Sequence, residues 1–526
     1  MTALVWAAYA LFAARRGLTY LHIFQQEEYD GGRFLRWVFR RRALDRRASA
    51  VLLIIGILDS VLSLPKVVSP LGICAALLAI AAFERDPRRL AKKQLVMTAR
   101  AKRTFWVAFV LLSGASAVTL RLPWPTLRWI LCVQAIPFVL VLASFCLQPY
   151  EHRIQQRFWR EAHAKLMSLK PMIIGLTGSY GKTSVKHILG HVIGAYAPTL
   201  STPGSVNTPM GIARIVREQL GPHHRFFLCE MGAYGPGSIE RLCRLAPPDL
   251  AIITAIGPAH YERFKSLEAV ARTKFELAQY ALDRGGKLVV THDVLSCPYP
   301  RSFYQTHRDR IVVVGSDLCC ELRVGAVDQT TQGISVEVVW AGTTYILRSR
   351  LYGSHHAMNL AMAFAAACVL GMAPGDAVVA IGSVPQVSHR LEVKRQPNGH
   401  VLIDDAYNSN PVGFVNGLQL LNYFRRGSGR RILVTPGMVE LGTAHDEEHR
   451  KIGECTGRHV DVLLAVVPQR IDPLIRAYSQ ANPQGTVISC SAFADAQRWL
   501  EANVRSEDVV LLENDLPDLY EKKLSL

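Results

Sequence analysis

Residues 177–186, "TGSYGKTSVK", place two glycines, a lysine, a threonine and a serine directly after the apolar run "PMIIGL". A glycine turn between a strand and a helix presents backbone N–H groups to phosphate, and the helix dipole favours the anion. Lys182 would neutralise the outer phosphates, and the Thr183 hydroxyl is a ligand type that suits Mg²⁺. The loop is shorter than the common G-x-x-x-x-G-K-[ST] form, because Gly178 lies only three residues before Gly181. The lysine, threonine and serine after a strand still favour phosphate binding over an ordinary helix-start turn.

Other residues with chemical potential are spread along the chain. Glu230 ends an apolar run, His260 follows the turn after another, and Lys274 lies in a helical pattern. Taken singly, these are typical of a surface acid, a capping histidine and a solvated lysine. Asp404 and Asp405 could form a metal-binding pair. The order of the motifs along the chain is more informative than any one of them.

Seven further stretches, together with the glycine loop, resemble the Mur ligases, which are ATP-dependent amide-forming enzymes of cell-wall synthesis. The resemblance is closest to the MurF branch, which adds D-alanyl-D-alanine, and it covers residues 165–526. The stretches occur in the family's order: "NTPMGIA" (207–213), "EMGAYGPGSIERL" (230–242), "TAIGPAHYERFKSLEAVARTKFELA" (254–278), "GSHHAMNLAMAFAA" (353–366), "HRLEV" (389–393), "IDDAYNSNP" (403–411) and "GMVELG…H" (437–449).

The resemblance implies an ATP site, two Mg²⁺ sites and a donor site. The implied ATP-binding residues are Gly178, Ser179, Tyr180, Gly181, Lys182, Thr183, Ser184, Asn359, Arg390, Asp405, Tyr407 and Asn410. The implied metal ligands are Thr183, Glu230, His260 and Lys274, the last as a carbamylated lysine. Thr202, Asn207 and Thr208 are the implied substrate residues, and Lys182, Lys274, His260 and Arg390 the implied catalytic ones. Amide formation would then pass through an acyl phosphate, in a site that closes over ATP.

The chain departs from the family pattern at two informative places. His389 stands where the family has a glycine before the linker arginine, and "ENDLPDLY" (513–520) replaces the "KGSR"-like loop expected after "DVVLL". That loop belongs to the acceptor side, so the incoming amine could differ from D-alanyl-D-alanine. The acidic residues Glu513, Asp515 and Asp518 suit a positively charged acceptor, and a solvated acidic face explains them equally well.

The N-terminal third differs in composition. Five apolar segments (2–14, 48–64, 67–83, 104–120 and 127–147) alternate with basic stretches at 15–47 and 84–103. Basic loops stay on the cytoplasmic side, so the ligase part is expected in the cytosol of a multi-pass inner-membrane protein. The net charge of +18 is therefore assigned to anionic lipid of the inner leaflet, and no nucleic-acid-binding module is recognised. The eleven cysteines, without a C-x-x-C, indicate reduced thiols.

These observations predict a helical transmembrane region (1–147), an interfacial linker helix (148–170), a central P-loop-type α/β ATPase domain (171–385) and a Rossmann-like α/β C-terminal domain (386–526). The predicted function is a membrane-bound ligase of an envelope precursor, lipid-linked or nucleotide-linked, with an amino acid or dipeptide amine. A lipid-linked donor is favoured because no soluble UDP-binding domain precedes residue 165. Two alternatives remain: a polyglutamate-type synthetase, and a membrane scaffold that binds ATP without catalysis.

Overall fold

The computed structural model describes residues 2–62, 65, 67–84, 86–88, 95–119, 125–257, 264, 266–406, 409–439, 441 and 444–514. The described residues divide into two compact units, one that ends at Gln155 and one that begins at Gln156. The first unit is helical and the second is α/β.

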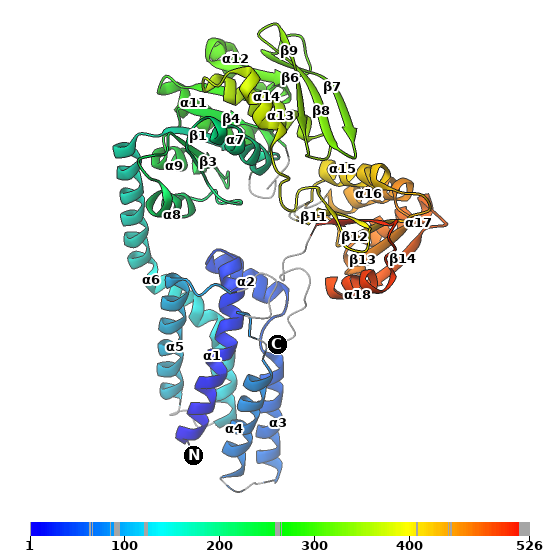
Figure 1. Ribbon diagram of the computed structural model, residues 1–526. Coiled ribbons are helices and arrows are strands. Elements are labelled where there is room, and N and C mark those ends of the chain that lie inside the picture. Colours follow the sequence, from blue (N-terminus) through cyan, green and yellow to red (C-terminus); the bar gives the residue numbers. More distant parts are fainter. Residues whose placement is uncertain are drawn as a thin grey trace. The chain divides into compact units, whose positions relative to one another are not determined.

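The helical unit contains α1 (Thr2–Gln26), α2 (Gly31–Arg40), α3 (Arg46–Leu62), α4 (Val68–Phe83), α5 (Ala99–Thr119) and the first part of α6 (Pro125–Leu169). Helix α1 packs against α4 and α5, and α3 packs against α4 (Figure 1). Large side chains such as Tyr9, Phe12 and Trp129 fill the space between them and are almost fully buried. Over their described residues, the five predicted apolar segments correspond to parts of α1, α3, α4, α5 and α6, except that Val67 precedes α4.

Two features of this unit differ from the sequence-based description. Helix α2 begins after Asp30, whose carboxylate accepts a hydrogen bond from the backbone N–H of Arg33 at 2.9 Å, and it buries Phe34 and Val38. The segments 127–147 and 148–170 form one continuous helix, α6, which includes Pro137 and Pro149.

Of the described residues, one helix, Thr126–Leu169, is long and apolar enough to cross a membrane, with a mean hydropathy of 2.5 in its best window. Helices α3 and α4 have 17 and 16 residues, fewer than the roughly 20 that span a bilayer squarely.

The ligase unit starts with a sheet that has nine strands among the described residues, in the order β2-β3-β1-β4-β5-β6-β7-β8-β9. Strands β1 to β7 pair in parallel, and β8 and β9 are antiparallel additions. The strands are β1 (Met172–Thr177), β2 (Thr199–Ser201), β3 (Phe226–Glu230), β4 (Leu250–Ile253), β5 (Lys287–Thr291), β6 (Ile311–Gly315), β7 (Leu322–Thr330), β8 (Gly333–Trp340) and β9 (Thr343–Ser349).

Helices cover both faces of this sheet, because its strands alternate buried side chains to the two sides (Figure 1). One face packs against α7 (Lys182–Tyr196), α13 (His356–Val369) and α14 (Pro374–Gly382). The other packs against α8 (Pro209–Gln219), α9 (Ser238–Leu245), α11 (Leu267–Asp283), α12 (Pro298–His307) and the end of α6. The short helices η1 (His292–Ser296) and η2 (Arg308–Arg310) follow β5 and α12. This three-layer arrangement confirms the predicted α/β class.

A second sheet has six strands among the described residues, in the order β10-β11-β15-β12-β13-β14, and is parallel except for the β10–β11 pair. Helices α15, α16 and α17 cover one face and α18 the other. The elements are β10 (Glu392–Arg395), β11 (Val401–Asp405), α15 (Pro411–Phe424), β12 (Arg431–Thr435), α16 (His445–His459), β13 (Val462–Val466), η4 (Pro468–Arg470), α17 (Asp472–Ala481), β14 (Thr486–Cys490), α18 (Phe493–Asn503) and β15 (Val509–Glu513).

Candidate active site

The glycine loop joins the end of β1 to the start of α7, as predicted. Gly181 has a φ of +78°, and a Cβ there would lie 2.8 Å from the side-chain oxygen of Asn359. A Cβ on Gly178 would lie 1.9 Å from the hydroxyl oxygen of Thr254. Both glycines are therefore required, one by its left-handed backbone and both by close neighbours. Helix α13 brings Asn359 to the loop from 178 residues further along the chain.

Side chains of the loop fix it to the segment that follows β4. The Ser179 hydroxyl donates to the carbonyl of Gly257 at 3.0 Å and accepts from the N–H of the same residue at 2.9 Å. The Thr254 hydroxyl donates to the carbonyl of Tyr180. Lys182 donates from Nζ to the carbonyl of Gly178 at 2.5 Å, so its ammonium is held at the loop itself. Ser184 is buried in the first turn of α7.

Glu230 lies at the end of β3 and contacts other residues predicted to bind metal and substrate. Its carboxylate is 1% exposed, and Oε2 accepts from the Thr183 hydroxyl at 3.2 Å. Oε1 accepts from the amide of Asn207 at 3.3 Å, and the backbone N–H of Glu230 donates to the hydroxyl of Thr202 at 3.2 Å. The predicted residues of the loop before α8 are therefore in direct contact with the predicted metal ligand. Thr208 instead caps α8, because its hydroxyl accepts from Gly211 N–H at 3.3 Å.

Lys186 is a member of this cluster that the sequence did not single out. Its side chain is 5% exposed, and Nζ lies 3.0 Å from Glu230 Oε2. The signal available in the sequence was a lysine one helical turn after Lys182, which places both on one face of α7. Nothing in the sequence indicated an acid partner 44 residues away.

Lys274 projects from α11 and is 4% exposed. Burial lowers its pKa well below the ordinary value, and the like charge of Lys182 lowers it further. Burial also lowers the pKa of Lys182, against the opposing effect of Glu230. The two predicted lysines therefore lie close enough to repel, which favours a neutral amine at Lys274. His260 lies outside the described residues.

The predicted nucleotide contacts of the second half reach the same region in part. The amide of Asn359 also lies 3.4 Å from Nδ1 of His356. Burial is the main cause of the lowered pKa values of Lys182 and His355. The positive charge of the nearby Arg390 lowers both pKa values further. The Asp405 carboxylate accepts from Leu391 N–H at 3.2 Å, and burial raises its pKa to about 6. Tyr407 lies outside the described residues.

Asn410 has a local structural role in this arrangement. It caps α15, since its side-chain oxygen accepts from Gly413 N–H at 3.0 Å. A contact between Asn410 and the adenine base remains a prediction.

Comparison with known proteins now identifies the family. The Mur ligase middle domain profile matches residues 176–367, and the profile "Mur ligase, glutamate ligase domain" matches residues 389–513. The UDP-N-acetylmuramoyl-tripeptide–D-alanyl-D-alanine ligase of Mycobacterium tuberculosis (strain H37Rv) is 30% identical over 374 residues, which cover 66% of this chain and 71% of that protein. The chain belongs to the Mur ligase family.

Other relatives agree with this assignment. The same ligase from Bacillus subtilis is 30% identical over 298 residues, and the match spans 62% of its length, slightly under two thirds. The MurF ligase of Thermotoga maritima in complex with ADP shares the fold, with a TM-score of 0.59 at 22% identity over 70% of this chain and 82% of that one. Members of the family are ATP-dependent ligases, and the loop geometry of this Mur ligase agrees with that chemistry.

The family implies Mg²⁺, and the residues present fit one such ion. Glu230 and Thr183 offer a carboxylate and a hydroxyl oxygen 3.2 Å apart, which are the hard donors that Mg²⁺ prefers. Nucleotide phosphate and water would complete its coordination.

A second acidic cluster is already neutralised by a side chain of the protein. His389, Glu392 and Asp404 have ligand atoms within 4.8 Å of one another, but Lys394 lies 2.9 Å from Glu392 and 3.1 Å from Asp404. The lysine ammonium therefore occupies the position between the two carboxylates that a metal ion would need.

The departures from the family pattern have structural explanations. His389 keeps a φ of +58°, the left-handed backbone that a glycine adopts freely, and its ring lies 2.9 Å from Asp404. Glu513 is fully buried beside Asp405 in the register of β11 and β15, and it accepts a hydrogen bond from the Ser409 hydroxyl. A solvated acidic face is therefore wrong for Glu513. Asp515 and Asp518 lie outside the described residues.

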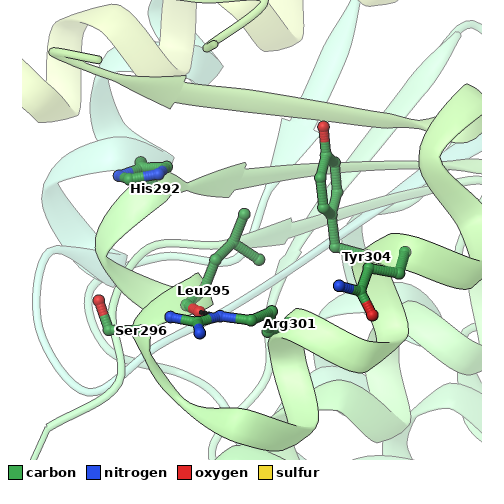
Figure 2. A pocket seen from close by; sticks show the side chains of 6 residues that line it. His292, Leu295, Ser296, Arg301 and Tyr304 are labelled. Carbon is green, nitrogen blue, oxygen red and sulfur yellow. Dashed lines mark hydrogen bonds between the residues drawn. The ribbon is translucent and has the colours of Figure 1, made fainter.

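A pocket of about 250 Å³ lies elsewhere on the same α/β domain (Figure 2). Its lining residues come from η1 and from α12. It is lined by His292, Leu295, Ser296, Arg301, Tyr304 and Gln305. None of the residues predicted for ATP, metal or substrate lines it, so the loop and Glu230 define the candidate active site.

Proposed function

We propose that this Mur ligase is membrane-bound and uses ATP to join the carboxylate of a cell-envelope precursor to an amine. The observation that carries the proposal is the convergence of Lys182, Thr183 and Asn207 on or beside Glu230. It brings the predicted phosphate loop, the predicted cation ligand and the predicted donor loop into one cluster. The named relatives act on a UDP-N-acetylmuramoyl-tripeptide and D-alanyl-D-alanine, which makes a peptidoglycan-type precursor the leading substrate class.

The proposed reaction has two steps. An oxygen of the donor carboxylate attacks the γ-phosphorus of ATP, so that an acyl phosphate forms and ADP leaves. The amine nitrogen then attacks the acyl carbon, a proton is lost from the nitrogen, and phosphate leaves. The backbone N–H groups at the start of α7 would hold the phosphates, and Lys182 would balance their charge.

Several groups would orient the nucleotide and the donor. Asn359 would contact adenine, Asp405 the ribose, and Arg390 the γ-phosphate after the domains close. Bound Mg²⁺ would supply charge neutralisation at the phosphates, held by Glu230 and Thr183. A neutral Lys274 amine can add CO₂ to form a carbamate, whose negative charge would make it a second metal ligand together with His260.

The membrane assignment rests on the composition of the helical unit. Helix α6 is apolar enough to span a bilayer, and Arg36 and Arg40 on α2 and Arg46 at the start of α3 are exposed. Such arginines suit anionic lipid of the inner leaflet, which would leave the ligase domains in the cytosol. A donor carried on a lipid pyrophosphate would be delivered at this surface.

The test is ADP release by the full chain in detergent, with UDP-linked and lipid-linked donors crossed against candidate amines. We expect turnover that needs both a donor and an amine, higher with lipid-linked donors, and no turnover in Lys182→Ala. Lys165→Ala, which changes a lysine on α6 that donates to the backbone carbonyl of Arg217, serves as the matched control. Turnover with glutamate alone as acceptor would instead support a polyglutamate-type synthetase. ATP binding without amine-dependent ADP release would support a scaffold, and activity in Lys182→Ala would refute the loop assignment.

A further inference from the structure

Lys186 is a buried lysine on α7 that the proposed reaction does not use. Its ammonium donates to two oxygen atoms, Glu230 Oε2 at 3.0 Å and the backbone carbonyl of Gly204. Lys186 is 4% exposed and Glu230 is 1% exposed. Burying an ammonium group costs free energy unless hydrogen-bonding and charged partners offset the loss of water. The two oxygen atoms therefore fix the position of the Lys186 ammonium.

The second partner belongs to the loop that precedes α8 and contains the predicted donor residues. The ends of this loop are attached to β3: Thr202 accepts from Glu230 N–H at 3.2 Å, and Asn207 donates to Glu230 Oε1 at 3.3 Å. The middle, at Gly204, is exposed and has a φ of +50°. Lys186 attaches this exposed middle to the buried carboxylate.

Asn207 is further oriented from the other side. The Tyr234 hydroxyl donates to the side-chain oxygen of Asn207 at 2.8 Å, which fixes the amide so that its nitrogen faces Glu230. The carboxylate of Glu230 is thus the common anchor of both the middle and the end of the loop. Because Lys186 contacts both Glu230 Oε2 and the carbonyl of Gly204, a change at Oε2 alters the position of Gly204 through this one side chain.

We infer that Lys186 is a positioning residue that couples the carboxylate of Glu230 to the donor loop, residues 202–208. This rests on the proposed function, which makes Glu230 a Mg²⁺ ligand and the loop a donor site. Lys186 acts in two ways of opposite sign. It holds the loop in place for the donor, and its charge opposes a divalent cation on the same carboxylate oxygen.

Neutralising Lys186 therefore weakens the binding of the donor and strengthens the binding of a divalent cation. Without the ammonium, the middle of the loop loses its attachment, so donor binding weakens. The carboxylate of Glu230 loses its resident cation, so a divalent cation binds it more tightly. If Lys186 merely supported the fold, its replacement would weaken the binding of both the donor and the divalent cation.

The experiment compares Lys186→Met, which keeps the length of the side chain, with Lys186→Arg, which keeps the charge. Lys165→Met is the matched control, because Lys165 also donates to a backbone carbonyl, that of Arg217 at 2.9 Å, away from the site. All proteins are the full chain in detergent. Hydrogen exchange of residues 202–208 and Mn²⁺ binding to nucleotide-free protein need no turnover.

In Lys186→Met we expect faster exchange at residues 202–208 and Mn²⁺ binding tighter by about fivefold or more. Where turnover is measurable, the KM for the donor should rise about tenfold, the loss expected for one charge-assisted hydrogen bond, while the KM for ATP changes little. Lys186→Arg should restore the exchange and the KM. Lys165→Met should leave all of these unchanged.

Three results would overturn the inference. One is unchanged exchange at residues 202–208 in Lys186→Met, and another is weaker Mn²⁺ binding. The third is a loss of ADP binding as large as in Lys182→Ala, which would place Lys186 in the nucleotide site. If Lys186→Met fails to fold, the Mn²⁺ affinity of Lys186→Arg is the deciding measurement. This variant keeps the charge, so its Mn²⁺ affinity should equal that of the wild type. A wild-type protein without turnover refutes the proposed function, while exchange and Mn²⁺ binding still test the role of Lys186.

Discussion

Glu513 makes the stability of the C-terminal domain depend on pH, and Glu513→Gln should remove its contribution to that dependence. The side chain is fully buried at the end of β15, and its Oε2 has no hydrogen-bond partner among the described residues. Burial raises the pKa of Glu513 well above its ordinary value, and the carboxylate of Asp405 raises it further. The Ser409 hydroxyl and the charge of Arg390 act in the opposite direction with smaller effect.

The sign follows from where the proton is bound. Above the ordinary carboxyl pKa the unfolded chain has lost this proton while the folded chain keeps it, so unfolding releases a proton and stability falls as pH rises. One such group changes the free energy of unfolding by at most about 1.4 kcal/mol per pH unit, or about 3 kcal/mol between pH 6 and 8. Glutamine has nearly the shape of the protonated carboxyl and does not titrate. At pH 8, Glu513→Gln should therefore be more stable than wild type, by up to roughly 10 °C in Tm for a domain of this size.

Scanning calorimetry of the full chain in detergent, from pH 5.5 to 8, measures this difference. We expect the two proteins to have nearly equal Tm at the acid end and to diverge as pH rises. Glu501→Gln, an exposed acid on α18, is the control and should follow the wild-type curve. Parallel curves for wild type and Glu513→Gln would show that Glu513 is ionised in the folded protein, and the reasoning from burial would then be wrong.

Three further outcomes are expected. Gly181→Ala should weaken ADP binding about tenfold in calorimetric titration, because a left-handed alanine costs about 1–2 kcal/mol and its Cβ meets Asn359 at 2.8 Å; unchanged affinity would show that the loop relaxes freely. Removal of CO₂ should lower turnover and bicarbonate should restore it, because the lowered pKa of Lys274 leaves a neutral amine to be carbamylated; turnover indifferent to CO₂ would exclude that modification. Arg16→Met should destabilise the helical unit by about 3–5 kcal/mol, seen as a loss of monodisperse protein in detergent, because it leaves buried Asp45 and Glu84 without their shared cation. Replacing the exposed Arg40 should have little effect on that measurement.

The sequence predicted the parts of the site that depend on local patterns. The loop between β1 and α7, the strand that ends at Glu230 and the α/β class all follow from short apolar runs with polar ends. Asn359 lies beside the loop at Gly181, and its predicted contact with adenine stays a prediction from the family motif. Such motifs retain their spacing because one strand and one turn determine where the side chain lies.

Features that depend on packing between distant segments could not be predicted. The burial of Lys186 requires Glu230 and Gly204, which lie on two other segments. Glu513 looked like a surface acid because its neighbours in the sequence are acidic, whereas strand pairing places it beside Asp405. The continuity of α6 was missed because the change from apolar to charged residues near residue 147 indicated a boundary between two helices that the backbone does not have. His260 and Tyr407 lie outside the described residues, so their assignments stay predictions.

The concentration of basic side chains around Glu230 has a practical consequence for handling the protein. The charge of Lys182 lowers the pKa of Lys274, while the Glu230 carboxylate interacts with both Lys182 and Lys186. Any small oxyanion in the buffer, such as sulfate or inorganic phosphate, would relieve this crowding and compete with the nucleotide. Inhibitor screens carried out in phosphate buffer would then underestimate weak anionic compounds, and chloride-based buffers at low ionic strength would give the truer ranking.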